Sequence, residues 1–245
     1  MNNYNPDYYE QDTLAGGGGF AIDAIAADRA TFIRKTYAHL AGAILLFMGL
    51  EFIIFSTPAL LEPILRLFGV SPWIILIAFM GASWIASSMA SSAKSLGTQY
   101  MGLGLFVIAE AIIFVPILFM ASRFAPEAHV IPVAAVITLC IFGGLTAYVF
   151  VTGADFSFLG GFLSIAMFAA IGIMIGSWLF GFSLGLFFTG AMILLMSGFI
   201  LYDTSNIMRH YDTNQYVSAS LALFAAVATL FWYVLRFVMM FSSND

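Results

Sequence analysis

The stretch FSLGLFFTGAMILLMSGFILYDTSNIMRHYD, residues 182–212, is uncharged from Phe182 to Tyr202 and then presents Asp203, ahead of Arg209. About 20 apolar residues, each rising 1.5 Å in a helix, span the roughly 30 Å hydrocarbon core of a bilayer. The stretch therefore predicts a membrane-spanning helix with one carboxylate near the point where the helix leaves the lipid.

The composition of the whole chain agrees with a membrane location. Of its 245 residues, 62% are hydrophobic and only 9% are charged, and the mean hydropathy is +1.01. Soluble domains have about 25% charged residues. The net charge is −5 and the eight Lys and Arg are scattered, so no basic patch predicts nucleic-acid binding. The single cysteine, Cys140, has no intrachain partner for a disulfide.

Seven apolar segments follow an acidic N-terminal region, so the predicted fold class is an all-α integral membrane protein with seven transmembrane helices. Residues 31–245 form the expected membrane domain. The expected spans are Tyr37–Ser56, Pro72–Ala93, Tyr100–Ala121, Val130–Thr152, Phe158–Phe180, Phe182–Ile207 and Val217–Phe241.

Residues 1–30 are expected to form a flexible, acidic, cytosolic tail. They contain five acidic residues, one arginine and the glycine run Gly16–Gly19. No basic segment precedes an apolar stretch there, so we expect no cleaved signal peptide. The tail either is a segment that a partner protein binds or has no function of its own.

The distribution of basic residues predicts the orientation. With the N-terminus inside, more of them face the cytoplasm than the outside, and seven spans put the C-terminus outside. The inner set is Arg29, Arg34, Lys35, Lys94 and Arg209, and the outer set is Arg66, Arg123 and Arg236.

Four charged residues and one histidine lie within the expected spans: Glu51, Glu110, Asp203, Arg236 and His39. A charge at a helix centre costs about 2.5–3.5 kcal/mol on insertion scales, so each needs a partner or a wet cavity. Depth alone places Glu110 near mid-membrane. It also allows two pairs, His39 with Asp203 near the cytoplasm and Glu51 with Arg236 in the outer half.

Each of these residues also has a purely structural interpretation. Arg236 can extend to the lipid headgroups, and Glu51 can be protonated or bonded to a neighbouring helix. Asp203 is either a helix-end acid solvated from the cytoplasm or a titratable latch. As a latch it binds a cation transiently, or a His or Arg partner, and releases it when protonated. Glu110 is too short to reach the headgroups.

No catalytic or metal-ligating arrangement is apparent. The three histidines His39, His129 and His210 lie on different segments, and Gly16–Gly19 lacks the Lys-Ser/Thr of a phosphate-binding loop. We therefore expect no enzyme activity and no cofactor.

Three motifs resemble the Bax inhibitor family: FIRKTYAHL at 32–40, SFLGG at 157–161 and LYDTSNIMRHYDTNQYVSASLALF at 201–224. Through DTSNI and SFLGG the chain is most similar to the bacterial YccA-like branch. The resemblance implies a seven-helix bundle whose last helix is central and wrapped by the other six, in a bacterial inner membrane.

Some members of that family act as pH-sensitive calcium leak channels, in which two aspartates on the last two helices share a proton. The first aspartate matches Asp203. When the sequence is aligned through LFWYVLR, Ala226 occupies the position of the second aspartate. One of the two aspartates that share the proton is therefore absent. Glu110 is a candidate replacement acid.

YccA-like members resemble regulators of membrane quality control that engage the membrane-anchored protease FtsH and its associated complex. The tail, with Tyr4, Tyr8 and Tyr9, is the segment that such a protease would grip. The sequence thus predicts a non-enzymatic stress and quality-control regulator of FtsH. The alternative is a pH-sensitive leak for calcium, other cations or protons, gated around Asp203.

Overall fold

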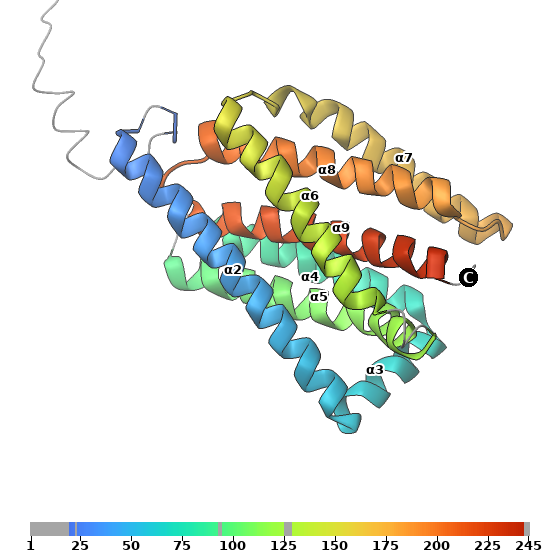
Figure 1. Ribbon diagram of the computed structural model, residues 1–245. Coiled ribbons are helices and arrows are strands. Elements are labelled where there is room, and N and C mark those ends of the chain that lie inside the picture. Colours follow the sequence, from blue (N-terminus) through green and yellow to red (C-terminus); the bar gives the residue numbers. More distant parts are fainter. Residues whose placement is uncertain (1–19, 23, 93–94, 125–128, 243–245) are drawn as a thin grey trace, which may run out of the picture.

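The computed structural model describes residues 20–22, 24–92, 95–124 and 129–242 (Figure 1). The predictions for Tyr4, Tyr8, Tyr9 and Lys94 concern residues outside these ranges. The expected flexible tail therefore stays a prediction, although the first helix already begins at Ala26, within its expected range.

The described chain is helical almost throughout, and seven of its helices are long and apolar enough to cross a membrane. This confirms the predicted fold class. The elements are α2 (Ala26–Ser56), α3 (Pro58–Val70), α4 (Pro72–Ala90), α5 (Leu96–Phe124), α6 (Val130–Thr152), the 3₁₀ helix η1 (Ser157–Leu159), α7 (Gly160–Phe180), α8 (Leu186–Arg209) and α9 (Tyr216–Ser242).

Proline and glycine set several helix ends. Pro58 and Pro72 stand in the first turns of α3 and α4, where a missing backbone N–H costs nothing and the fixed φ suits a helix. Gly153 and Gly181 end α6 and α7 with φ of 62° and 71°, a left-handed conformation that glycine adopts without strain.

The bounds differ from the prediction mainly at the first span. α2 begins at Ala26, well before the expected Tyr37, and the connection after it folds into α3. The short helix α3 is not among the membrane-spanning candidates.

The last helix occupies the centre of the bundle. In the described chain α9 packs against α2, α4, α5, α6 and α8, and Figure 1 shows it between α6 and the α4–α5 pair. This confirms the predicted central position. α7 lies outermost and packs against α8. In the described chain its backbone does not approach that of α9, but the hydroxyl of Tyr233 on α9 donates to the sulfur of Met174 on α7 over 3.7 Å.

α4 and α5 approach closely at Gly102. A Cβ built there would lie 2.6 Å from the carbonyl oxygen of Ala86 and 2.6 Å from the backbone nitrogen of Ala90. Real Cβ atoms do not come so near backbone atoms, so only glycine fits this crossing.

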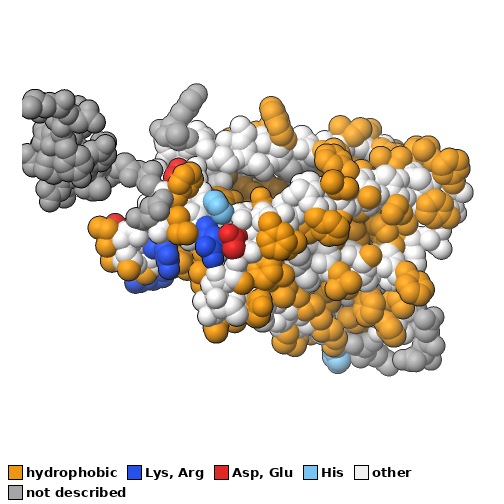
Figure 2. Space-filling model, turned by 90° about the horizontal axis from the view of Figure 1, so that it is seen from above, with side chains coloured by type: hydrophobic (Ala, Val, Ile, Leu, Met, Phe, Trp, Pro, Cys, Tyr) orange, Lys and Arg blue, Asp and Glu red, His pale blue; other side chains and the backbone are white. Residues whose placement is uncertain are grey.

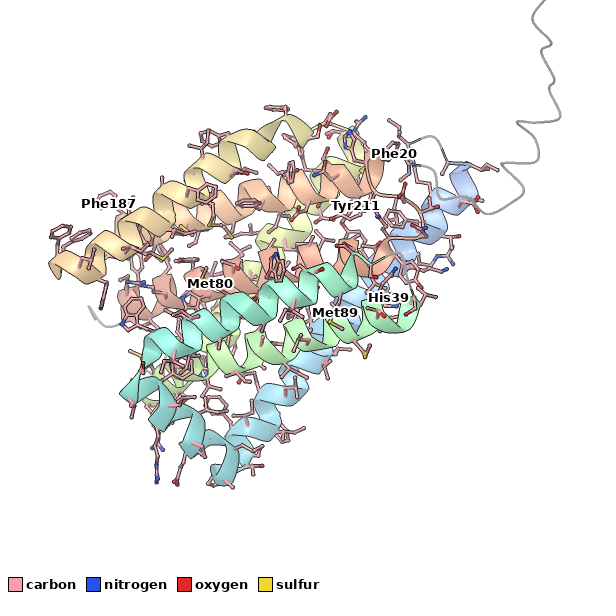
Figure 3. All side chains as sticks on the ribbon, turned by 180° about the vertical axis from the view of Figure 1, so that it is seen from behind. Phe20, His39, Met80, Met89, Phe187 and Tyr211 are labelled. Atoms are coloured by element: carbon pink, nitrogen blue, oxygen red, sulfur yellow. The ribbon has the colours of Figure 1, made fainter. Side chains whose placement is uncertain are left out.

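The helix ends define two ends of the bundle. We call the end at which α2 begins the proximal end; α8 also finishes there and α9 starts there. Figure 3 shows Phe20, His39 and Tyr211 at this end and Phe187 at the opposite, distal end. On the face shown in Figure 2, the basic and acidic side chains gather at the proximal end, whereas the rest of the face shows hydrophobic side chains interspersed with backbone and uncharged side chains.

Candidate functional site around Asp203

A polar cavity of about 470 Å³ opens at the proximal end, and Asp203 is part of its wall. The lining comes from the start of η1, the last turns of α8 and the loop that leads to α9: Ser157, Tyr202, Asp203, Asn206, His210, Tyr211 and Gln215. Amide, hydroxyl and imidazole groups thus surround one carboxylate. We call this space the Asp203 cavity.

Asp203 makes no hydrogen bond and no ion pair in the described part of the chain. The charge of Asp203 acts on two phenols, those of Tyr37 and Tyr211. Burial raises the pKa of the Tyr211 hydroxyl, and the charge of Asp203 raises it further. Tyr211 therefore keeps its proton and presents a hydrogen-bond donor beside the carboxylate.

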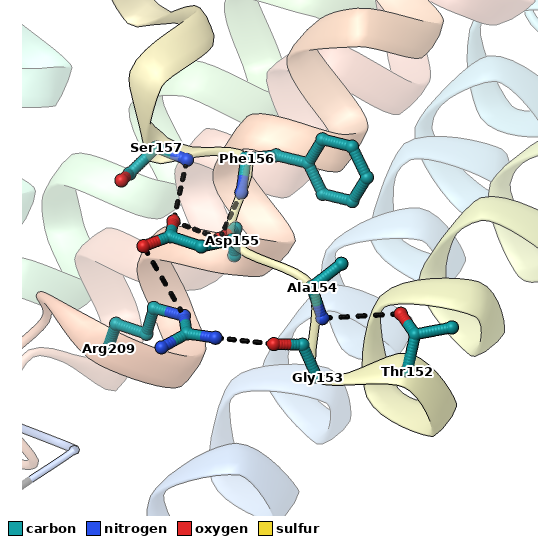
Figure 4. Close-up of polar contacts among 8 residues, drawn as sticks. Thr152, Gly153, Ala154, Asp155, Phe156, Ser157 and Arg209 are labelled. Carbon is teal, nitrogen blue, oxygen red and sulfur yellow. Dashed lines mark hydrogen bonds and ion pairs between the residues drawn. The ribbon is translucent and has the colours of Figure 1, made fainter.

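The basic residue that follows Asp203 on α8 is bound elsewhere. The Nε of Arg209 lies 3.9 Å from Oδ2 of Asp155, in the loop between α6 and η1, and its Nη2 donates to the carbonyl of Gly153 (Figure 4). The backbone N–H of Ser157 donates to Asp155 over 2.9 Å, and the hydroxyl of Ser205 over 3.2 Å.

These contacts lower the pKa of Asp155, with the Ser157 N–H contributing most and the Ser205 hydroxyl and Arg209 adding to it. The Ser205 hydroxyl also accepts from the N–H of Phe156 over 2.9 Å. The loop before α7 is therefore fastened to the end of α8, and Arg209 is used in that fastening. We call this set the Asp155–Arg209 network. It was not predicted, although Asp155 and Arg209 each follow an apolar run that ends at the same side of the membrane.

Deeper in the bundle, three hydroxyl groups from three helices converge next to Asp203. Those of Thr146 and Thr204 lie next to the phenol of Tyr37, which also experiences the charge of Asp203. All three oxygens are buried, and within the described ranges none has a hydrogen-bond partner of good geometry. Buried polar atoms in this state take up an ordered water or an ion.

Comparison with known proteins places the sequence of this chain in a family. The family profile described as "Inhibitor of apoptosis-promoting Bax1" matches residues 29–243. The chain belongs to this Bax inhibitor family. It is 28% identical to Bax inhibitor 1 of Schizosaccharomyces pombe, covering 89% of this chain and 79% of that protein.

Other relatives span bacteria and animals. The chain is 31% identical to an uncharacterized protein of Pseudomonas aeruginosa, over 81% of this chain and 84% of that one. It is 26% identical to protein lifeguard 4 of Mus musculus, over 90% of both chains. This member of the Bax inhibitor family is thus a multi-pass membrane protein with bacterial relatives.

The expected pair of His39 with Asp203 is wrong. The Nδ1 of His39 lies 2.6 Å from the carbonyl of Lys35, and its Nε2 lies 2.9 Å from the hydroxyl of Tyr100 on α5. Its ring also packs against Tyr216. α2 and α8 are neighbours, but this face of α2 points at α5 and α9.

The expected pair of Glu51 with Arg236 is also wrong. Nη2 of Arg236 donates to the carbonyl of Leu184, ahead of α8, over 2.7 Å. Both carboxyl oxygens of Glu51 are buried and have no hydrogen-bond partner in the part of the chain that the structure describes. Arg236 therefore fastens a loop and does not neutralise an acid.

Glu110 does not replace the absent second aspartate beside Asp203. It is 5% exposed on α5, and α5 and α8 do not pack against each other in the described chain. Ala226 is buried on α9, 7% exposed. Among the described residues no three His, Cys, Asp or Glu side chains gather as metal ligands, so a cation at Asp203 would meet one carboxylate and neutral oxygens.

Proposed function

We propose that this Bax inhibitor family member is a non-enzymatic leak pathway for calcium or another cation, with Asp203 as the gate. The observation that supports it is the unpaired carboxylate of a polar cavity at one end of a membrane bundle. Because Arg209 pairs with Asp155, it does not neutralise Asp203, and the Asp203 carboxylate can bind a proton or a cation. A proton neutralises the site, and its loss makes the site attractive to calcium.

The structure corresponds to a closed pathway in this proposal. Beyond the Asp203 cavity, α9 fills the bundle centre with Leu223, Phe224 and Leu230, each at most 2% exposed. Conduction therefore requires α9 to shift against its neighbours. Tyr37, Thr146 and Thr204 provide the next oxygens for a dehydrated ion beyond Asp203.

We infer that the protein is of the bacterial YccA-like branch and resides in the inner membrane, with the proximal end in the cytoplasm. Arg29, Arg34, Lys35 and Arg209 belong to that end, whereas Arg66, Arg123 and Arg236 belong to the distal half. This excess supports the orientation through the positive-inside rule.

Flux through liposomes tests the proposal. Purified full-length protein should release calcium from loaded vesicles at a rate that changes with pH. Asp203→Asn removes the titration, so its flux should no longer depend on pH. Glu62→Gln, which alters an exposed carboxylate on α3, is the matched control and should behave as wild type. Impermeable vesicles, or an Asp203→Asn protein with wild-type pH dependence, would rule the pathway out.

A second function, regulation of the protease FtsH and its complex in stress and membrane quality control, has its own support. The N–H of Ala21 donates to the carbonyl of Tyr211 over 2.9 Å, and Phe20 pairs with Asp212. The acidic residues 1–19 thus precede an anchor on the loop that lines the Asp203 cavity. A protease that pulls on that region acts on the loop as well.

Deletion of residues 2–19 tests this second function. With purified FtsH in shared liposomes, the full-length chain should be degraded and should slow the degradation of a second membrane substrate. The truncated chain should resist degradation and lose that effect. Equal degradation kinetics for both chains would contradict a role for this segment in FtsH regulation.

A further inference from the structure

A second cavity, of about 370 Å³, lies among α2, α5, α6 and α9. Its walls are almost entirely apolar, and they include Phe47, Leu118, Phe224 and Phe231. Among the described residues that line it, Glu51 is the one with a titratable side chain. Small-molecule pockets are of this kind, about 300–1,000 Å³, mostly apolar, with a few placed polar groups. We call it the Glu51 pocket.

The pocket is bounded at the bundle surface by α2 and α6. In the described chain the backbones of these two helices do not approach each other, although both pack on α9. Tyr37 bridges them toward the proximal end, where its ring packs against Phe142 and Phe150. Farther along, Met48 and Leu139 line the pocket and are more than half exposed. Exposed apolar side chains on a membrane span face lipid, so the pocket opens sideways into the bilayer.

Glu51 is an unusual group for such a place. Glu51 is 8% exposed, and neither of its carboxyl oxygens has a hydrogen-bond partner among the described residues. The other polar lining residue, Thr138, donates its hydroxyl proton to the carbonyl of Ala134 over 2.8 Å. Arg236 is engaged by Leu184. A buried carboxyl without a partner is costly, and a ligand that supplies the missing donor recovers that cost.

We propose that the Glu51 pocket binds a single-chain hydrophobic primary amine that enters from the bilayer. The ammonium donates to the Glu51 carboxylate, and the alkyl chain packs along Phe224 and Phe231. Charge complementarity selects this head group. An ammonium group neutralises the carboxylate and has several protons to donate. The hydroxyl of an alcohol has one proton to donate and no charge. A fatty acid would place a second carboxyl group beside Glu51.

Binding of tritiated dodecylamine to the full-length protein in nanodiscs tests the proposal. The wild-type protein should bind it saturably at one site per chain. Glu51→Gln should weaken binding about tenfold or more, the factor that a charge-assisted hydrogen bond supplies. Ala135→Trp, which fills the pocket and keeps the carboxylate, should also abolish binding. Glu62→Gln, on exposed α3, should bind as wild type.

Unlabelled competitors of equal chain length separate the head groups. Dodecan-1-ol and dodecanoic acid should displace the label about tenfold less well than dodecylamine. Non-saturable uptake, equal binding by wild type and Glu51→Gln, or equal displacement by the alcohol would each overturn the proposal. Thermal unfolding shows whether each variant is folded. Glu51→Gln should unfold close to the wild-type temperature, because an uncharged amide of nearly the same size replaces the buried carboxyl group.

Discussion

The guanidinium of Arg209 lies 3.9 Å from the carboxylate of Asp155, and Asp203, on the same helix as Arg209, has no basic partner among the described residues. Two acids at the same end of the bundle therefore have different surroundings. Asp155 is fixed by Ser157, Ser205 and Arg209, whereas Asp203 faces a polar cavity.

The Asp155–Arg209 network should stabilise the loop between α6 and α7. Asp155→Asn removes the ion pair and weakens the acceptor for Ser157 and Ser205, so we expect a lower unfolding temperature. Arg209→Gln should do the same, since it also removes the bond to the Gly153 carbonyl. The double variant should lose less than the sum of the two single losses, because both variants remove the same ion pair. Thermal unfolding in detergent measures this. Additive losses would show that the two residues act separately.

The same network should not set the pH dependence of ion flux. Since the pKa of Asp155 is lowered in the folded protein, its contribution to stability is present above the unfolded value of about 3.9 and is lost as the pH falls through the lowered pKa. Between pH 5 and 8 the group stays ionised. Asp155→Asn vesicles should therefore keep the wild-type flux midpoint in this range. A shifted midpoint would implicate Asp155 in gating.

The anchor between Ala21 and Tyr211 should connect the N-terminal region with the Asp203 cavity. Ala21→Pro removes the N–H that donates to the Tyr211 carbonyl. We expect faster hydrogen exchange at residues 211–215 and faster degradation by FtsH, because the loop is released. Asp28→Ala, beyond the anchor, is the control. Unchanged exchange in Ala21→Pro would show that the contact does not hold the loop.

Gly102 should be the least replaceable glycine of the α4–α5 crossing. Gly102→Ala places a Cβ 2.6 Å from backbone atoms of α4, so we expect a loss of about 1–3 kcal/mol in the free energy of unfolding from overpacking. At Gly104 a Cβ meets nothing within 4 Å. Gly104→Ala should therefore be neutral or stabilising by up to about 1 kcal/mol, the helix preference for alanine. Equal changes in the free energy of unfolding for the two variants would show that the backbone of α4 shifts to accommodate the added methyl group.

The spans were predictable because their apolar length is a direct physical requirement. Val130–Thr152 was predicted with the bounds that α6 has. The early start of α2 was missed because Asp28, Arg29 and Lys35 mark the end of the lipid-facing run but not the end of the helix. α3 was missed because Pro63 and the charged pair Glu62–Arg66 resemble a connecting loop.

For the site residues, the sequence predicted only their depth in the membrane. Asp203 was expected near the proximal end because its apolar run ends there, and it lies there. Both predicted pairs failed because depth fixes one coordinate of a side chain and not the direction in which it points. From residue 38 to 56 the only ionisable residues of α2 are His39 and Glu51, so no polar stripe indicated that His39 faces Tyr100 and Glu51 faces a pocket.

Infrared difference spectroscopy of the reconstituted protein tests the central claim most directly, because protonated and ionised carboxyl groups absorb at different frequencies. Acidification should produce a protonated-carboxyl band that is absent in Asp203→Asn, and calcium should shift its appearance to lower pH, since proton and cation compete for Asp203. Spectra that are the same for wild type and Asp203→Asn, or a band that calcium does not move, would contradict the claim.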